Sequence, residues 1–417
     1  MMRGLRFGSV LLVLSGFGVW LLSNVQWQYK KRTPELLNVW VQADAELLPF
    51  YQKLVQDTEL AKMRININIQ SAPHSFHPSE YLKSISDATG VAGEVLVSPP
   101  FDLFIGSSQV GARLCEQGLV NCHLDSRLVE GLDERLIHLV QRKGQSFGVP
   151  LFFSEAYVIF YDREKIPLLP RALQDIEKTV APFNDPYRGF FGVALAEDSA
   201  SFLLFLTAGN FFTVAAKKAD KSLAIKRAFE TLQDLQFLEA LVPHHCSAEC
   251  VVRIFRERRA PLAIAPLEHL HEFQKVLGDR LGLAPLPTLD QDPMRSPYDG
   301  QFAFVSAHLD QDKKSAVENF LNFLSSPFLQ ERIATVWGRR PANLHVVQNQ
   351  NVKGARLIRE LLSATEQSLV LVPWGDVQQL TSLAEKVLNP FHQGRLTPEA
   401  AAAVFAKSLS ENSMTAE

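Results

Sequence analysis

Hydrophobic runs and amphipathic segments alternate along most of the chain. Runs of apolar and β-branched residues, bounded by polar or turn-forming residues, predict the first strands. These expected strands lie at 37–41, 64–70, 101–105, 156–161 and 260–265. Between the first two, apolar side chains recur at helical spacing over 46–59 and predict a helix. Strand, helix and strand in this order favour a mostly parallel sheet covered by helices, so an α/β fold is expected.

The rest of the chain continues this pattern and becomes mainly helical towards its end. Further strands are expected at 191–196, 283–287 and 301–306. Further helices are expected at 79–86, 202–211, 222–237, 250–258, 314–325, 327–336, 354–363, 377–387 and 397–409. The run at 156–161 is apolar throughout, which is typical of a strand buried on both faces at the centre of a sheet.

The N-terminal segment has the pattern of a targeting sequence. Arg3 and Arg6 precede an apolar stretch over 7–25, and basic residues follow it. This pattern indicates an export signal or a membrane anchor within residues 1–35. Because no small-x-small cleavage site is well placed, an uncleaved anchor is favoured over a removed signal. Either one places the remaining chain in the periplasm or another extracytoplasmic space, where a hydrophobic helix can tether it to the cytoplasmic membrane.

Composition supports a folded chain and argues against two classes of function. The 417 residues exceed one ordinary domain, and 47% of them are hydrophobic, which is enough for a sizeable core. The net charge of −3 gives no support to nucleic-acid binding. P-loop, G-x-G-x-x-G and H-E-x-x-H motifs are absent. We therefore expect no catalysis, no cofactor and no resident metal.

Four cysteines form two pairs that are close in sequence. An even number in an exported chain permits the disulfides Cys115–Cys122 and Cys246–Cys250. Cys115 and Cys122 would be too far apart on a continuous helix, but Gly118 is expected to end that helix. Both pairings remain open at this stage. A metal site at the His-His-Cys sequence that contains Cys246 is a less favoured alternative, because its spacing fits no zinc pattern.

Six groups of segments, in this order and at this spacing, are similar to the family 1 extracellular solute-binding proteins, the maltose-binding-protein-like group. They cover about residues 36–412. The groups are 38–50; 101–106 with 116–120; 144–150 with 155 and 161–162; 258–265 with 283–287; 299–300, 305–306, 316–326, 330, 338 and 341–342; and 394–401.

The resemblance implies a two-lobed periplasmic-binding-protein fold of type II. Lobe 1 is expected to comprise 36–153 and 296–340, and lobe 2 to comprise 154–295 and 341–412. The ligand cleft lies between the lobes, which close over the solute. The resemblance also implies a monomer that delivers a small solute, a sugar or oligosaccharide, to an ABC permease in the cytoplasmic membrane.

Sugar sites need hydrogen-bonding side chains for the hydroxyls and aromatic faces for the apolar side of the ring. By the resemblance, Asp44, Glu155 and Glu197 match sugar-contacting acids of the maltose binders, and Gln42 matches a polar neighbour of the first. Further ligand contacts are expected at Ser108, Gln109, Phe202, Glu268, Tyr298, Asp299 and Trp374.

The sequence departs from the maltose binders where aromatic stacking residues are expected. Glu268 stands at about the place of one tryptophan and Thr381 at that of another. A different or smaller solute is therefore expected. The several acids leave a cationic solute such as a polyamine as an alternative, and a membrane-anchored sensor or scaffold with the same fold is another. Arg339 and Arg340 are expected to form an exposed pair, with contact to an anionic ligand or to the permease as the alternatives.

Overall fold

The computed structural model describes residues 35–42, 47–54, 65–72, 100–208, 211–212, 218–349, 356–372 and 374–413. The chain forms two compact units. Unit 1 comprises Met1–Ile105, Gln117–Asn121 and Phe304–Phe323, and unit 2 comprises Gly106–Glu116, Cys122–Ala303 and Leu324–Glu417. The lobe boundaries expected from the sequence differ from these units and remain a prediction.

The strands are β1 Glu35–Val41, β2 Ile65–Ser71, β3 Leu103–Gly106, β4 Gln141–Arg142, β5 Gln145–Ser146, β6 Val149–Ser154, β7 Tyr157–Asp162, β8 Val193–Ala194, β9 Leu262–Pro266, β10 Leu281–Ala284, β11 Thr288–Leu289, β12 Asp292–Pro293, β13 Ser296–Pro297, β14 Asp299–Val305 and β15 Leu369–Val370.

The α-helices are α2 Leu47–Leu54, α5 Ser108–Glu116, α6 Glu134–Leu139, α7 Leu173–Val180, α8 Ser199–Thr207, α9 Lys218–Gln233, α10 Ala248–Arg256, α11 Leu270–Leu277, α12 Lys314–Leu324, α13 Pro327–Trp337, α14 Leu344–Gln348, α15 Arg356–Ser368, α16 Trp374–His392 and α17 Pro398–Ser413. Short 3-10 helices lie at Ser126–Val129, Ala181–Phe183, Pro186–Arg188, Leu267–His269, Gly278–Arg280 and Gln311–Lys313, and a π-helical turn at Asp234–Leu238 continues α9.

The first sheet has the strand order β2-β1-β3-β14-β6. β1 runs parallel to both β2 and β3, with Val39 aligned with Ile69 and with Leu103. In β1 the side chains of Leu37, Val39 and Val41 are buried and alternate with more exposed ones, as the period of a strand requires. β14 belongs to both units, because its last two residues fall in unit 1 and the others in unit 2.

The second sheet lies in unit 2 and has the order β10-β7-β9-β8. β8 is parallel to β9, but β7 is antiparallel to both β9 and β10. β14 likewise runs antiparallel to β6. The expectation of mostly parallel pairing is therefore wrong for these two strands. β7 and β14 pair with strands that are distant in the sequence, so the order of neighbouring elements along the chain does not set the direction of these pairs.

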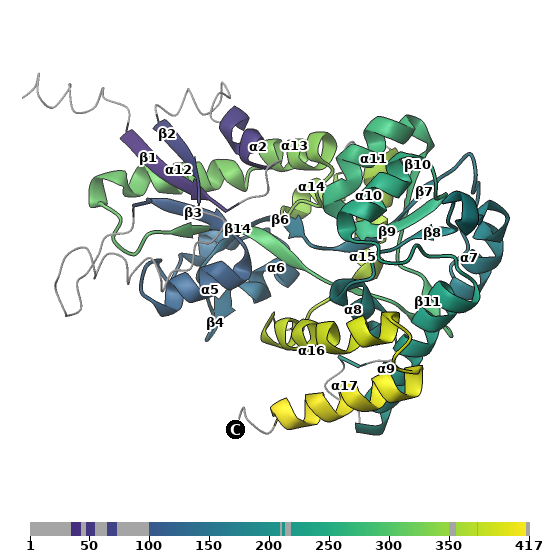
Figure 1. Cartoon of the computed structure of the whole chain (residues 1–417). Coiled ribbons are helices and arrows are strands. Elements are labelled where there is room, and N and C mark those ends of the chain that lie inside the picture. The colour runs from purple at the N-terminus through teal and green to yellow at the C-terminus, as the bar shows by residue number, and fades with distance from the viewer. Residues whose placement is uncertain are drawn as a thin grey trace, which may run out of the picture. The chain divides into compact units, whose positions relative to one another are not determined.

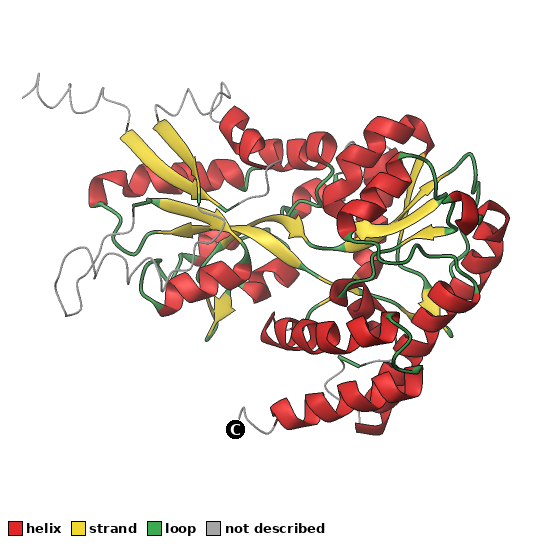
Figure 2. Cartoon of the chain, viewed as in Figure 1, coloured by secondary structure: helices red, strands yellow, loops and turns green. Residues whose placement is uncertain are grey.

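The core of unit 2 covers both faces of β7, whose successive side chains point to opposite sides. The Phe160 ring lies 4.9 Å from that of Phe273 on α11, which lies 4.7 Å from Phe255 on α10. Ile159 and Tyr161 instead join a large apolar cluster formed with α8, α9, α16 and α17. Figure 1 shows α10 and α11 beside this sheet, and Figure 2 shows its strands flanked by helices.

The remaining sequence predictions were met unevenly. The strand expected at 191–196 is reduced to two residues of β8, and the helix expected at 202–211 begins earlier, as α8. α8 begins at Ser199 because the Asp198 carboxylate caps it, accepting the Ser201 N–H at 2.8 Å. α7, α11 and β6 were not predicted. The helix expected at 79–86 lies outside the described residues.

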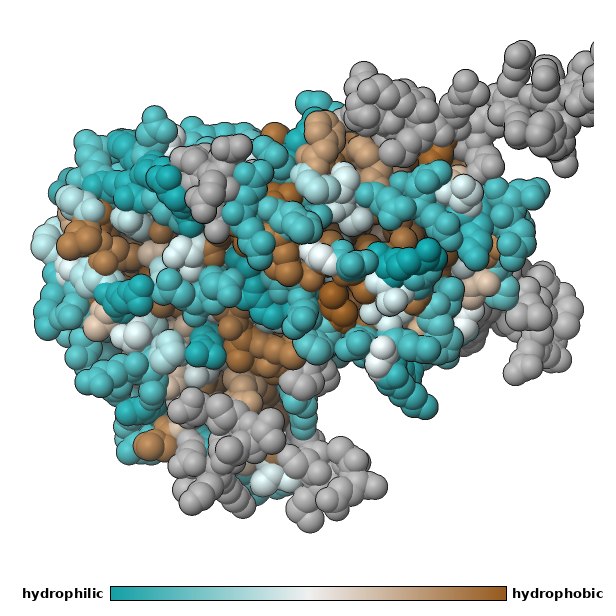
Figure 3. Space-filling model, turned by 180° about the vertical axis from the view of Figure 1, so that it is seen from behind, coloured by the Kyte–Doolittle hydropathy of each residue, from teal (hydrophilic) through white to brown (hydrophobic). Residues whose placement is uncertain are grey.

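The predicted anchor over 7–25 also lies outside the described residues. Within the part of the chain that the structure describes, no helix has the length and apolar character of a membrane span. Figure 3 shows a largely hydrophilic surface on which hydrophobic side chains gather in several patches. Among the described residues, Leu168 and Tyr187 are the most exposed large hydrophobic side chains. Single exposures of this kind are ordinary on folded proteins.

Candidate functional site

A cavity of about 500 Å³ lies in unit 2, a volume typical of small-molecule sites. Its walls come from the β6–β7 junction, β7, α8, the end of β9, the turn after β9, β13 and α16. The lining residues are Glu155, Tyr157, Ala200, Leu203, Leu204, Pro266, Glu268, Ser296, Pro297, Tyr298, Val377, Gln378, Thr381, Ser382 and Glu385. The structure thus brings together three residues expected from the sequence, Glu155, Glu268 and Tyr298.

Glu155 has a backbone conformation that is rare for residues with a side chain. Its φ is +59°, in the left-handed region. Its N–H donates to the Glu268 Oε1 atom at 2.9 Å, and the same oxygen lies 3.0 Å from Nη1 of Arg339. The Arg339 side chain is buried, so its guanidinium fixes the Glu268 carboxylate from within the protein. Strain held in this way is common at ligand sites.

Two tyrosines line the cavity. The Tyr157 N–H donates to Ser296 Oγ at 2.9 Å, and the Tyr298 hydroxyl donates to the carbonyl of Arg135 at 3.3 Å. Burial raises the pKa of both phenols, and for Tyr157 the nearby carboxylates of Asp198, Glu268 and Glu155 raise the pKa further. Both phenols therefore stay protonated at neutral pH and offer an apolar ring as well as a hydroxyl.

α16 supplies a polar wall that the sequence analysis did not identify. Gln378, Thr381, Ser382 and Glu385 line the cavity at positions i, i+3, i+4 and i+7 of this helix, so they share one face. α8 contributes apolar side chains, Leu203 and Leu204 among them. The signal was present in the sequence, because 377–387 was predicted as a helix. A polar stripe at helical spacing is usually a solvated surface, and for that reason it was not recognised.

Other expected ligand residues lie away from the cavity. Phe202 is fully buried in the core, with its ring 4.6 Å from that of Phe229. Asp299 is buried too, and its Oδ1 accepts the N–H groups of Ser108 at 3.3 Å and Gly300 at 2.7 Å. Asp299 therefore holds the start of α5 in place, and neither Phe202 nor Asp299 is among the residues that line the cavity.

Two further candidates, Gln42 and Gln109, are not among the described residues that line the cavity. Gln42 follows β1 in unit 1, where its N–H donates to the carbonyl of Ile105 at 2.8 Å. Gln109 lies in the first turn of α5. Asp44 lies outside the described residues, and so does the side chain of Trp374, the first residue of α16. Their expected contacts with a ligand remain predictions.

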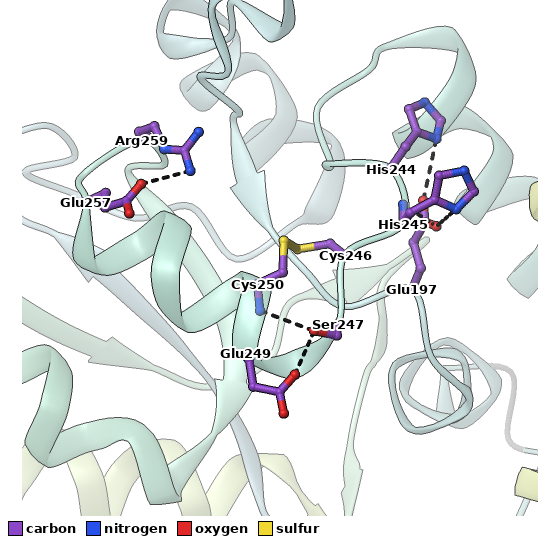
Figure 4. Close-up of a disulfide and its surroundings, with 9 residues drawn as sticks. All are labelled: Glu197, His244, His245, Cys246, Ser247, Glu249, Cys250, Glu257 and Arg259. Carbon is purple, nitrogen blue, oxygen red and sulfur yellow. Dashed lines mark hydrogen bonds and ion pairs between the residues drawn. A yellow bond between two sulfur atoms is a disulfide. The ribbon is translucent and has the colours of Figure 1, made fainter.

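Glu197 has a distinct environment beside a disulfide (Figure 4). Its carboxylate is buried, and its Oε2 accepts the His245 N–H at 2.7 Å. Its Oε1 lies 3.5 Å from Nδ1 of His244. Burial raises the pKa of the Glu197 carboxyl, although both histidines act in the opposite direction. Glu197 fixes the turn before Cys246 and is not one of the lining residues of the cavity.

The structure contains both disulfides. Cys115 and Cys122 have Cα atoms 5.4 Å apart, because α5 ends at Glu116 and Gly118, with φ of +69°, reverses the chain. Cys246 is joined to Cys250, with Cα atoms 5.2 Å apart. The Cys246 sulfur is therefore not free to ligate a metal, and within the described part of the chain no group of three or more His, Cys, Asp or Glu side chains is placed to hold one.

The expectation that Arg339 and Arg340 are exposed is wrong. Arg339 is buried against Glu268, and Arg340 is buried with its Nη2 at 2.8 Å from Glu366 and 3.4 Å from Asp133. Burial alone would raise the pKa of Asp133, but hydrogen bonds and charge from Arg135, with the charge of Arg340, lower it. Each arginine is buried because a carboxylate from another element meets it, which local sequence does not reveal.

The comparisons with known proteins agree with the fold. A model of the bacterial extracellular solute-binding proteins matches residues 84–359. The chain belongs to this family. No curated protein matches the sequence. The family binds solutes outside the cell, so a binding role is assigned to the chain at this level.

Many solved structures are similar to this chain. Those described here are less than 25% identical to it in sequence. The maltose/maltodextrin-binding domain MalE from Bdellovibrio bacteriovorus, bound to maltotriose, is 18% identical with a TM-score of 0.69, over 90% of this chain and 99% of that one. Maltose-bound MalE3 from T. maritima is 17% identical with a TM-score of 0.71, over 90% and 99%. The GacH receptor of Streptomyces glaucescens, solved unliganded and with acarbose, is 16% identical with a TM-score of 0.70, over 90% and 98%. The expected two-lobed periplasmic-binding-protein fold is confirmed.

Proposed function

We propose that this member of the solute-binding family is an extracytoplasmic receptor that captures a saccharide and delivers it to an ABC permease. The observation that carries the proposal is the meeting of Glu155, Glu268 and Tyr298 at one cavity, after each had been expected to contact a ligand. Maltotriose, maltose and acarbose in the three similar structures support the saccharide class.

The chemistry of the cavity suits a polyhydroxylated solute. A carboxylate accepts hydrogen bonds from two sugar hydroxyls, and Glu155, Glu268 and Glu385 supply such groups. Tyr157 and Tyr298 add ring faces and hydroxyls. These groups take the place of the stacking tryptophans of the maltose binders, which the sequence lacks. They support a saccharide different from a long maltodextrin.

The proposed motion is closure of two lobes about the expected boundaries near residues 153 and 296. The structure supports these boundaries in one respect. β6 and β14 pair there, with Ser154 aligned with Asp299, and Tyr157 is hydrogen-bonded to Ser296. The two expected crossover segments thus run side by side, as a hinge requires. The solute must bind the closed form more tightly, since otherwise it could not drive closure.

The proposed location is outside the cytoplasmic membrane, with the N-terminal hydrophobic stretch as a tether. The proposed role involves reversible binding of the solute, without catalysis. The receptor is proposed to act as a monomer and to present its closed form to the permease.

A thermal-shift screen of the purified chain tests the proposal. Neutral disaccharides and trisaccharides, polyamines, amino acids and organophosphates are compared at equal concentration. A solute at 100 times its dissociation constant adds about 2.7 kcal/mol to the free energy of unfolding, which is a readily measured shift. Stabilisation by saccharides is expected. Stabilisation by no solute at all would contradict the receptor and favour the sensor or scaffold.

A further inference from the structure

The walls of the cavity carry acidic groups and no basic ones among the described residues. Glu155, Glu268 and Glu385 line it, together with hydroxyl, amide and apolar side chains. Glu268 is already paired with Arg339, which is buried and is not part of the lining. With three glutamates and no basic side chain among the lining residues, the formal charge of the walls is negative.

The position of Glu385 differs from that of the other two carboxylates. It lies at the end of the polar face of α16 that begins at Gln378, about 10 Å away along the helix axis at 1.5 Å per residue. That length matches a disaccharide laid along the helix. Glu385 is exposed, and among the described residues it forms no ion pair or hydrogen bond. Its full charge is therefore available to a solute in the cavity.

The electrostatic surroundings of Tyr157 agree with this picture. Burial raises the pKa of its phenol, and the carboxylates of Asp198, Glu268 and Glu155 raise it further. The cavity wall at Tyr157 therefore lies in a field that disfavours an anion. A solute with a phosphate or a carboxylate would be repelled, whereas a protonated amine would be attracted.

We propose that the receptor selects a saccharide that carries a protonated amine, with its hydroxyls along Gln378, Thr381 and Ser382 and its ammonium group at Glu385. This inference rests on the proposed saccharide receptor and adds the class of sugar. The hydroxyl and amide groups of α16 distinguish such a solute from a simple polyamine, because they bind sugar hydroxyls and give a hydrocarbon chain nothing to bind. A charge-assisted hydrogen bond at Glu385 adds to the affinity of the amine form.

Matched pairs of sugars test the proposal by isothermal titration calorimetry on the full chain at pH 6. Each pair differs only by an amine in place of a hydroxyl: glucosamine and glucose, the β-1,4-linked glucosamine dimer and cellobiose, and 2-trehalosamine and trehalose. Putrescine is the control amine. In the pairs that bind, the amine form is expected to bind about tenfold more tightly, and the preference should fall with added salt.

Glu385→Gln removes the charge while keeping a similar shape. It is expected to weaken binding of the amine form much more than binding of the neutral sugar, so that the preference for the amine form is lost. Glu318→Gln, at an exposed position on α12 away from the cavity lining, is the matched control and should change nothing. Differential scanning calorimetry of both variants separates lost binding from lost folding.

Each outcome has a separate meaning. Equal or tighter binding of the neutral sugars would overturn the inference and leave the saccharide receptor standing. A preference that survives Glu385→Gln would overturn the assignment of the ammonium group to Glu385. Putrescine binding as tightly as the amino sugars would overturn the saccharide part of the inference. Binding of none of the sugars would contradict the proposed receptor itself.

Discussion

Glu155 shows how single residues prepare the cavity. Its left-handed backbone, the Glu268 carboxylate that accepts its N–H and the buried Arg339 behind that carboxylate form one chain of contacts. The resemblance to the maltose binders predicted the acidic residues but not their connection, because a buried arginine and a positive φ depend on the tertiary structure. A non-glycine residue in this region costs roughly 1–2 kcal/mol.

Replacement of Glu155 tests whether the left-handed backbone conformation at this position is strained. Glu155→Ala removes the side chain and keeps the strain, whereas Glu155→Gly removes both. The glycine variant is expected to have a free energy of unfolding about 1 kcal/mol higher than the alanine variant, by chemical denaturation. Both should bind saccharide more weakly than the wild type. A glycine variant no more stable than the alanine variant would show that the backbone is unstrained.

Asp299 provides a pH-dependent prediction at the residue scale. Burial raises the pKa of its carboxyl to about 6. Because this value is above that of the unfolded chain, the charged form opposes folding, and stability should decrease as the pH rises from about 4 through 6. Asp299→Asn keeps an acceptor for the N–H groups of Ser108 and Gly300 and cannot ionise. Relative to the wild type, it should gain up to about 3 kcal/mol of unfolding free energy over this interval.

Denaturant titrations of both chains between pH 4 and pH 7 measure this difference. A difference that stays constant across the interval would mean that Asp299 titrates in the folded protein as it does in the unfolded one.

At the scale of elements, strong periodicity predicted most helices and strands, and backbone chemistry explains one of the misses. β6 was missed because Pro150 lowers the expectation of a strand. In the structure Pro150 lies opposite Phe302, where the register with β14 shifts after Gln301. Proline is tolerated at such a bulge. The polar face of α16 was missed for another reason, since only the tertiary structure turns a surface stripe into a wall of the cavity.

The Cys246–Cys250 disulfide offers a test at the scale of elements. It joins the residue before the Ser247 cap to the first turn of α10. A disulfide that closes such a short loop is expected to add about 2 kcal/mol to the free energy of unfolding, because it restricts the unfolded chain. The double variant Cys246→Ser with Cys250→Ser should lose about that much in denaturant unfolding. The equivalent pair of serines at Cys115 and Cys122 is a comparison of the same kind, and an unchanged midpoint in either would contradict the disulfide's role.

At the scale of the whole molecule, the order of six weak segments predicted the family and the fold, which the comparisons confirm. The solute, the lobe boundaries and the tether are proposals, because similarity at identities near 17% shows the fold and not the ligand. Small-angle X-ray scattering tests lobe closure. A saturating saccharide is expected to reduce the radius of gyration of the chain. An unchanged radius with bound saccharide would exclude closure as the signal.

The most direct test of the central claim is isothermal titration of the most stabilising saccharide into the wild type and the Glu155→Ala variant. If the cavity is the binding site, the variant should bind about 1–3 kcal/mol more weakly, because it loses hydrogen bonds to the sugar. Glu130→Ala, at an exposed position that does not line the cavity, serves as the control and should match the wild type. Equal affinity of wild type and Glu155→Ala would place the saccharide elsewhere and contradict the account.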